Sequence, residues 1–220
     1  MNAWEDLAAR LNDALPQTQC TRCGYPDCRS YAEAIARDGE SINRCPPGGQ
    51  EGVRRLASLA ACAPMPLDPA CGVEAERAVA VVDEHWCIGC TLCIKACPVD
   101  AIVGAAKTMH SVITSDCNGC ELCIPVCPVD CIRMYSVTPG QTAWSAWSAE
   151  QAQASRHLYE RRQARMPEAE RRQAERLAHK AEAKLANLAT HRPVPGADEA
   201  KRAIVEAALA KARARANKAR

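Results

Sequence analysis

Fifteen cysteines occur in this chain of 220 residues, and eight of them fall in two short arrays of identical spacing. The first array begins at Cys87 and reads CIGCTLCIKACPVDAI, and the second begins at Cys117 and reads CNGCELCIPVCPVDCI. Eleven of the sixteen aligned positions are identical, and the two arrays are offset by 30 residues. Because chance does not produce such agreement, the segment is an internal duplication.

The spacing C-x2-C-x2-C-x3-C-P is typical of bacterial proteins that bind two [4Fe-4S] clusters. Three cysteines on one tight loop can reach a single cubane cluster, whereas the fourth lies just beyond the loop and reaches the cluster of the other array. A pair of structural zinc sites is the alternative, but such sites typically join separated C-x2-C pairs. The spacing therefore predicts two cross-ligated clusters. The predicted ligands are Cys87, Cys90, Cys93 and Cys127 at site 2, and Cys97, Cys117, Cys120 and Cys123 at site 3.

A third set of cysteines precedes the duplication and consists of Cys20, Cys23, Cys28 and Cys45, here called site 1. Four thiolates at this spacing can enclose one further cubane cluster, and the stretch 29–38 between them reads as a helix that Gly39 closes. Zinc is a more serious alternative at site 1, because this spacing is less specific. With site 1 included, twelve cysteines are expected to hold three [4Fe-4S] clusters.

The three remaining cysteines are Cys62, Cys71 and Cys131. Cys62 and Cys71 flank a proline-rich stretch, and Cys131 takes the place that Ala101 holds in the first array. A spare ligand or a redox-active thiol is one interpretation. We expect small buried or linker cysteines instead, with Cys131 packed near a cluster, because free cysteine usually behaves as a small apolar residue.

No nucleotide-binding glycine motif and no nucleophile–base pattern occurs in the sequence. His85 and His110 are isolated from other chemistry-bearing residues, and we expect them to be solvated or packed. The chain is therefore expected to be an electron carrier without a catalytic site of its own. Whether it forms part of an oxidoreductase complex is not decided by these motifs.

Composition limits the size of the apolar core. The chain has no Phe and only eight Trp and Tyr residues, and alanine and cysteine supply much of its 48% hydrophobic content. A chain so poor in large apolar side chains is expected to depend on bound metal for stability.

Charge is divided unevenly along the sequence: residues 1–147 hold 17 acidic and 11 basic residues, whereas residues 148–220 hold 9 acidic and 17 basic residues. An acidic cysteine-rich body therefore carries a basic tail.

The predicted fold class is α+β, with three parts in sequence: a small helical [4Fe-4S] module, a two-cluster bacterial ferredoxin-like domain with a pseudo-twofold repeat, and an α-helical basic tail. The expected boundaries are 1–55 for the first module, 56–78 for a proline-rich linker, 79–137 for the ferredoxin domain, 138–147 for a hinge and 148–220 for the tail. Each repeat copy is expected to contain a strand, the cysteine loop, a short helix and a second strand. The strands are expected at 79–82, 102–105, 109–114 and 132–137.

The tail reads as a series of helices. Ser148 and Gln151 form a plausible capping box for the first, and Pro167 followed by acidic residues marks a second start. A break is expected at 193–196, and a last helix is expected to begin at Asp198. The tail is expected to be a solvated helix or a dock for an acidic protein. An anionic membrane surface is a further functional interpretation of the tail. Nucleic acid is less expected, because no aromatic interleaving and no folded DNA-binding module accompanies the charge.

The cysteine segments resemble the B subunit of Rnf-type electron transport complexes. The resemblance is carried by CTRCGYPDCRSYAEAIARDGESINRCPPGG and by the duplicated segment from Cys87 to Met134, and it covers about residues 15–137. It implies that Cys20, Cys23, Cys28 and Cys45 are ligands of a first cluster. It also implies that the partners are other subunits of a membrane complex that couples reduced ferredoxin and NAD to ion movement or helps to reduce redox regulators. Two departures are that the family usually begins with a transmembrane anchor, which this chain lacks, and that the resemblance does not explain the basic tail.

These observations predict a protein that passes single electrons through three [4Fe-4S] clusters, as a subunit of an Rnf-like complex. A soluble polyferredoxin serving a cytoplasmic oxidoreductase is the alternative, and an iron–sulfur regulator that binds nucleic acid through the tail is less expected. The first residues show no secretory signal and no stretch reaches the ~20 apolar residues that span a bilayer. The expected location is therefore cytoplasmic, at the inner membrane only peripherally or through partner subunits.

Overall fold

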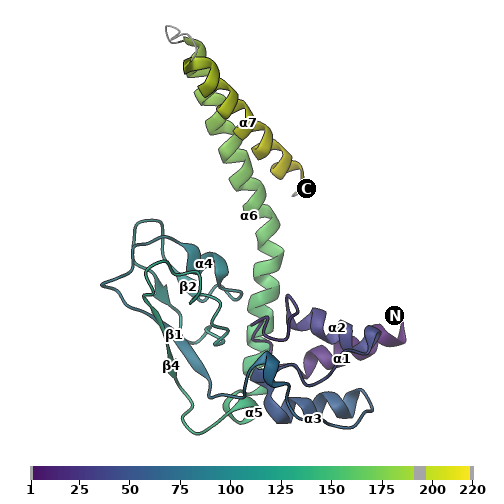
Figure 1. Cartoon of the computed structure of the whole chain (residues 1–220). Coiled ribbons are helices and arrows are strands. Elements are labelled where there is room, and N and C mark those ends of the chain that lie inside the picture. Colours follow the sequence, from purple (N-terminus) through teal and green to yellow (C-terminus); the bar gives the residue numbers. More distant parts are fainter. Residues whose placement is uncertain (1, 191–196, 219–220) are drawn as a thin grey trace. The chain divides into compact units, whose positions relative to one another are not determined.

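The computed structural model describes residues 2–190 and 197–218, which divide into two compact units after Glu160. The predicted mixture of helices and short strands is confirmed, and all fifteen cysteines lie in the first unit. The helices are α1 (Ala3–Asp13), α2 (Cys28–Asp38), α3 (Gly49–Leu59), α4 (Leu92–Ala96), α5 (Ala143–Ala146), α6 (Ala149–Thr190) and α7 (Ala197–Lys218); the strands are β1 (Ala78–Val82), β2 (Ile102–Val103), β3 (Ser111–Val112) and β4 (Ile132–Ser136) (Figure 1).

Helices α1, α2 and α3 enclose the first apolar core. The side chain of Asp27 caps α2 by accepting a hydrogen bond of 2.7 Å from the N–H of Ser30, and Gly39 ends the helix with a φ of 70°. Such a left-handed residue is the usual stop signal of a helix, and the predicted helix at 29–38 is confirmed. Helix α3 continues to Leu59, into the stretch expected to be a linker. The largest buried side chains of this core are Leu11, Leu15, Tyr31, Val53 and Leu56.

The duplicated segment forms two small antiparallel sheets. Strand β1 pairs with β4, from Ala78 opposite Ser136 to Val82 opposite Ile132, and β2 pairs with β3 (Figure 1). The first strand of one copy thus pairs with the last strand of the other. All four predicted strands are present, although β2 and β3 contain two residues each and are shorter than expected.

The short helix expected in each copy forms only in the first, where it is α4. The N–H of Lys95 donates to the carbonyl oxygen of Thr91 at 3.3 Å inside that helix. Pro125 occupies the equivalent position of the second copy, and proline has no N–H to donate. The second copy therefore forms tight turns, with the N–H of Cys127 donating to the carbonyl oxygen of Ile124.

The segments expected to be a hinge and the start of the tail contribute buried residues to the first unit. Helix α5 lies inside the expected hinge, and Trp147 directly after it is 8% exposed. The capping box at the start of α6 is confirmed: the N–H of Ser148 donates to Gln151 Oε1 at 2.9 Å, and the N–H of Gln151 donates to Ser148 Oγ at 3.2 Å. Side chains of the first turns of α6, including Ala152 and Ser155, are buried.

The prediction that a new helix starts at Pro167 is wrong, because α6 continues through this residue. Proline removes one hydrogen bond of the helix, and the next turns carry ion pairs that stabilise it. Glu168 lies 2.6 Å from Arg172 and 2.8 Å from Arg171.

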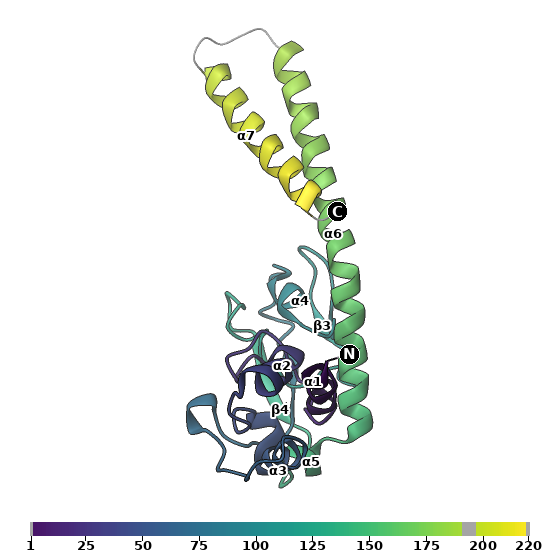
Figure 2. The same cartoon turned by 90° about the vertical axis from the view of Figure 1, so that its right-hand side faces the viewer.

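Within the second unit, α7 runs beside the end of α6, and Arg213 on α7 lies 2.8 Å from Glu182 on α6 (Figure 2). The break expected at 193–196 falls outside the described residues.

None of the helices within 2–190 and 197–218 combines enough length with enough apolar character to cross a bilayer.

Candidate cluster-binding sites

The four cysteines predicted for site 1 are brought together by the first helical module. Cys23, Cys28 and Cys45 are buried and Cys20 is half-buried. Burial, together with the neighbouring thiols, raises the pKa of Cys28 to about 12 and that of Cys45 well above its usual value. Each of these two thiols interacts electrostatically with all three others of the set, so the four form one group.

The loop that carries Cys20 has an unusual backbone. Gln17, Gln19 and Thr21 all have positive φ values, of 57°, 54° and 60°. Such conformations cost on the order of 1–3 kcal/mol for a residue other than glycine, and they gather at functional sites. The amide side chain of Gln19 fixes this loop to α2, because its Oε1 accepts the N–H of Cys28 at 2.9 Å.

The turn after Cys45 leaves room beside its sulfur. A Cβ added at Gly48 would lie 3.4 Å from Cys45 Sγ and 3.7 Å from the ring of Pro16. A Cβ at Gly48 would therefore be in van der Waals contact with the Cys45 sulfur.

Sites 2 and 3 exchange their fourth cysteine between the two repeat copies. One cavity, with an empty volume of about 310 Å³, is lined by the second-copy loop and by Cys97 from the first copy. A second cavity, of about 270 Å³, is lined by the first-copy loop and by Cys127 from the second copy. The four cysteines predicted for site 3 thus line one cavity, and the four predicted for site 2 line the other together with Cys131. The cysteines lining the cavities are Cys97, Cys117, Cys120 and Cys123 at site 3 and Cys87, Cys90, Cys93 and Cys127 at site 2.

Backbone strain recurs at equivalent positions of the two copies. The residues that follow Cys90 and Cys120, which are Thr91 and Glu121, have φ values of 66° and 64°. Gly89 and Gly119 also have positive φ, and a Cβ at either would lie 2.6 Å from backbone atoms of the opposing copy, at Thr108 or Ala78. The cysteine loops therefore need glycine here both for conformation and for close packing.

The chemistry of the donor sets suits an iron–sulfur cluster. Burial raises the pKa of Cys120 and Cys123 to about 12, with a further contribution from the neighbouring thiols. Four clustered thiolates would repel one another, so they can all ionise only when positive charge lies between them. In the described residues no three Cys, His, Asp or Glu side chains converge as the ligands of one metal ion would. At sites 2 and 3 the thiols instead border a cavity.

Two residues outside the predicted ligand sets also line the cavity of site 2. His110 is packed, as expected, with 2% of its surface exposed, but it is not isolated, because its Nδ1 lies 3.2 Å from Cys93 Sγ. Cys131 is buried as expected, and its Sγ lies 3.5 Å from Cys127 Sγ. An alignment of the two repeat copies that included the residues before the cysteine arrays would have shown that His110 stands where the first copy has Ala80.

The other two spare cysteines lie apart from the duplicated segment. Cys62 is exposed, and Cys71 is half-buried with its Sγ 3.8 Å from Asp68 Oδ2. Neither belongs to a predicted set.

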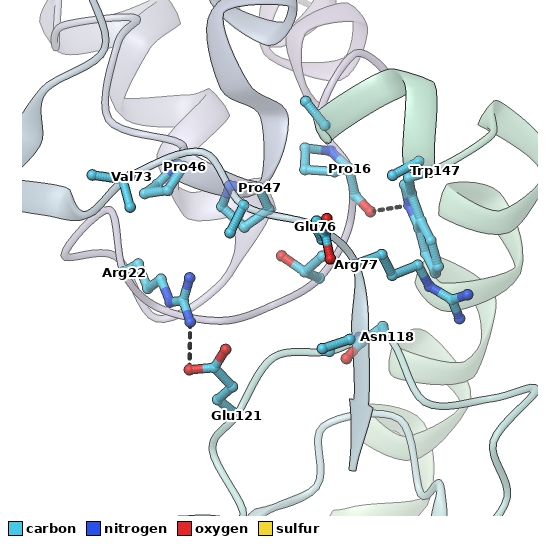
Figure 3. Close-up of a pocket in the computed structure, with 16 residues that line it drawn as sticks. Pro16, Arg22, Pro46, Pro47, Val73, Glu76, Arg77, Asn118, Glu121 and Trp147 are labelled. Atoms are coloured by element: carbon cyan, nitrogen blue, oxygen red, sulfur yellow. Dashed lines mark hydrogen bonds and ion pairs between the residues drawn. The ribbon is translucent and has the colours of Figure 1, made fainter. Parts of the chain in front are cut away.

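Site 1 lies against the loop of site 3 (Figure 3). Arg22, which lies between Cys20 and Cys23, forms an ion pair of 2.6 Å with Glu121, which follows Cys120. Together with Pro16, Pro46 and Trp147, these residues line a cavity with an empty volume of about 560 Å³. The indole N–H of Trp147 donates to the carbonyl oxygen of Pro16 at 2.8 Å, which fixes the start of the site 1 loop.

Two consecutive buried hydrogen bonds join the loop of site 3 to the loop of site 1. Asn118 Nδ2 donates to Ser155 Oγ at 3.0 Å, and Ser155 Oγ donates to the carbonyl oxygen of Gln17 at 2.7 Å. Both side chains are less than a tenth exposed. Buried hydrogen bonds of this kind fix relative positions, because breaking one leaves an unpaired polar group.

Two family descriptions match the segments that carry the cysteines. A family described as "4Fe-4S dicluster domain" matches residues 80–134, and one described as "Putative Fe-S cluster" matches residues 15–47. The second match favours iron–sulfur over zinc at site 1. No solved structure matches the chain.

Curated proteins named as the B subunit of an ion-translocating oxidoreductase complex are similar to the chain. The protein of Azoarcus sp. is 58% identical over 140 residues, which are 64% of this chain and 76% of that protein. That of Stutzerimonas stutzeri is 59% identical over 140 residues, or 72% of its length. That of Thiobacillus denitrificans is 58% identical over 110 residues, which are 50% of this chain and 58% of that protein.

Proposed function

This chain belongs to the family of B subunits of ion-translocating oxidoreductase complexes, and from that membership we propose that it carries single electrons as a subunit of an Rnf-type complex. The observation that carries the proposal is the grouping of twelve cysteines into three sets within one compact unit.

We propose that each set holds one [4Fe-4S] cluster, three in all. A bound cubane cluster supplies one-electron oxidation and reduction. The chain supplies the thiolates, buries eight of the twelve against water, and directs N–H groups at several of the sulfurs. Ala101 N–H lies 3.2 Å from Cys97 Sγ, and Ala80 N–H lies 3.4 Å from Cys117 Sγ.

Contacts of the site 3 loop with residues of both other sites support the proposal. The Arg22–Glu121 ion pair and the Asn118–Ser155 hydrogen bond connect its loop to site 1. Its thiol Cys123 interacts electrostatically with Cys93 of site 2. This arrangement supports the use of all three sites by one electron carrier.

The partners follow from the family. The relatives are named as subunits of an ion-translocating oxidoreductase complex, and we propose that the partners of this chain are other redox subunits of such a complex. The proposed place is the cytoplasmic face of the inner membrane, reached through those subunits. The helical module of 1–55, the linker of 56–78, the ferredoxin domain of 79–137, the hinge of 138–147 and the tail of 148–220 remain our proposed division.

Anaerobic co-purification tests this function. The full chain, carrying an affinity tag, is recovered from its native cells after gentle detergent extraction, and the accompanying proteins are identified. We expect integral membrane redox subunits in stoichiometric amount, together with iron and sulfide on this chain. A parallel extraction uses tagged protein in which Cys20 and Cys45 are both changed to Ser. It distinguishes assembly of the complex, seen in the accompanying subunits, from loading of site 1, seen in the iron content.

Recovery of the iron-loaded chain without any membrane subunit would contradict complex membership. It would favour a free polyferredoxin, which is the alternative function for the same three sites.

A further inference from the structure

The two repeat copies offer the same backbone hydrogen bonds to the cysteine that each exchanges. The N–H of Ala101 lies 3.2 Å from Cys97 Sγ, and the N–H of Cys131, 30 residues later, lies 3.4 Å from Cys127 Sγ. The main chain therefore offers an equivalent N–H donor to the exchanged cysteine of each site, Cys127 at site 2 and Cys97 at site 3.

The side chain at position 131 breaks this equivalence. The first copy has Ala101 and the second has Cys131, whose Sγ lies 3.5 Å from Cys127 Sγ and is buried in the cavity of site 2. A Cys127 that binds iron does so as a thiolate and has no proton. The hydrogen between the two sulfur atoms therefore belongs to Cys131, which donates a weak S–H···S hydrogen bond.

His110 provides a second difference between the sites. It replaces Ala80 of the first copy and is 2% exposed, and its Nδ1 lies 3.2 Å from Cys93 Sγ. Because a ligating Cys93 can only accept, Nδ1 carries the hydrogen and donates. Its other ring nitrogen, Nε2, is buried and has no partner among the described residues, although the ring lines the site 2 cavity.

Hydrogen bonds to the sulfur ligands are one of the factors that set the potential of an iron–sulfur cluster. One-electron reduction adds a negative charge to the site, and donors aimed at the ligand sulfurs stabilise the more negative state. In the described part of the chain, the hydrogen bonds to the sulfurs of site 3 come from main-chain N–H groups, at Cys97 and Cys117.

We propose that His110 and Cys131 raise the reduction potential at site 2 and so make the two repeat copies unequal as electron acceptors. This inference rests on the proposed ligand sets. Arg77 acts separately at site 3, where it donates to the carbonyl oxygen of Cys117 at 3.0 Å, and this contact is the same in every variant described below.

The repeat itself supplies matched variants. C131A gives the second copy the residue of the first, and A101C places a thiol at the equivalent position of site 3. H110L removes the imidazole donor, whereas H110Q keeps an N–H donor. Each full-length variant is purified anaerobically, its iron and sulfide are counted, and its potentials are measured by film voltammetry with EPR at fixed potentials.

We expect C131A and H110L to shift the same wave to lower potential, with the other waves and the iron content unchanged. H110L should lower the ratio of reduced to oxidised site 2 about tenfold at a given potential, which is a shift of about 59 mV for one electron. C131A should give a smaller shift, and H110Q should stay closer to wild type. A101C should raise a different wave.

Unchanged potentials in C131A and H110L at full iron content would overturn the proposal. Loss of iron from C131A would overturn it too, because Cys131 would then be a ligand. If H110L does not fold, the pair C131A and A101C still decides the matter. A wild-type chain with fewer than three clusters contradicts the proposed function instead, and the iron count shows this before any variant is compared.

Discussion

Burial keeps the thiols of Cys28 and Cys120 neutral in the absence of iron. The pKa of each is raised to about 12, first by desolvation and then by the nearby thiols. Ligands of iron must be deprotonated, so cluster binding releases protons and couples the folding of these loops to iron. A chain with no Phe and few aromatic side chains can gain much of its stability from that coupling.

Single cysteine substitutions test the ligand sets. We expect C28S, C90S and C120S each to remove or destabilise one cluster, because each lies in a different set, and iron should fall by about a third. The measurement is iron per chain after anaerobic purification, with the visible absorption spectrum.

The matched control is C62S, since Cys62 is exposed and belongs to no set. This substitution should leave iron content unchanged. Iron loss at C62S comparable to that at C90S would show that the ligand assignment is wrong.

At the scale of single residues, the spacing of the cysteines indicated the four that line the site 3 cavity and four of the five that line the site 2 cavity. His110 was not predicted, because its partner Cys93 is 17 residues away and the repeat had been compared only within the cysteine arrays. The strained backbone at Gln17 and Gln19 was not predicted either, since glutamine gives no sign of a positive φ.

At the scale of elements, local capping signals were read correctly, whereas the effect of proline was misjudged twice. The Gly39 stop and the Ser148 capping box each depend on neighbours in sequence and occur where expected. The prediction of a short helix in the second copy and the prediction of a helix start at Pro167 failed for opposite reasons. Pro125 prevented a five-residue helix from forming, whereas one proline was insufficient to end a helix of 42 residues.

Pro167 offers a prediction about α6. The residue is exposed within the helix, so P167A restores a main-chain hydrogen bond without changing a buried contact. We expect the helix to be stabilised by up to ~3 kcal/mol, the difference between proline and alanine inside a helix. Far-ultraviolet circular dichroism during thermal unfolding measures the change.

The matched control is Q173A, also at an exposed position of α6, where the helix propensities of the two residues are similar. Its melting profile should follow that of wild type. A P167A profile that coincides with the Q173A profile would show that α6 does not gain from losing the proline.

At the scale of the whole molecule, the boundary of the first unit could not be predicted from composition. The charge and alanine content change near Ser148, but the compact unit extends to Glu160. The reason is a set of contacts between residues far apart in sequence. Ser155 contacts Gln17, and the hydroxyl of Tyr159 donates to Asp27 Oδ2 at 3.0 Å. Such pairings leave no local signal in either segment.

These contacts predict how far the chain can be shortened. A chain ending at Glu160 keeps all fifteen cysteines and both apolar cores, so its iron content and visible spectrum should equal those of the full chain. A chain ending at Val137 keeps the same cysteines but loses Trp147, Ser155 and Tyr159, whose hydrogen bonds reach the loop of site 1 and the cap of α2. Each buried hydrogen bond removed leaves an unpaired group that costs ~1–3 kcal/mol, so this shorter chain should lose its site 1 cluster at lower temperature.

Iron retention during stepwise anaerobic heating compares the two shortened chains. Equal retention in both shortened chains would mean that the first turns of α6 do not stabilise site 1, whereas early loss from the chain ending at Glu160 would mean that the second unit contributes to holding the clusters.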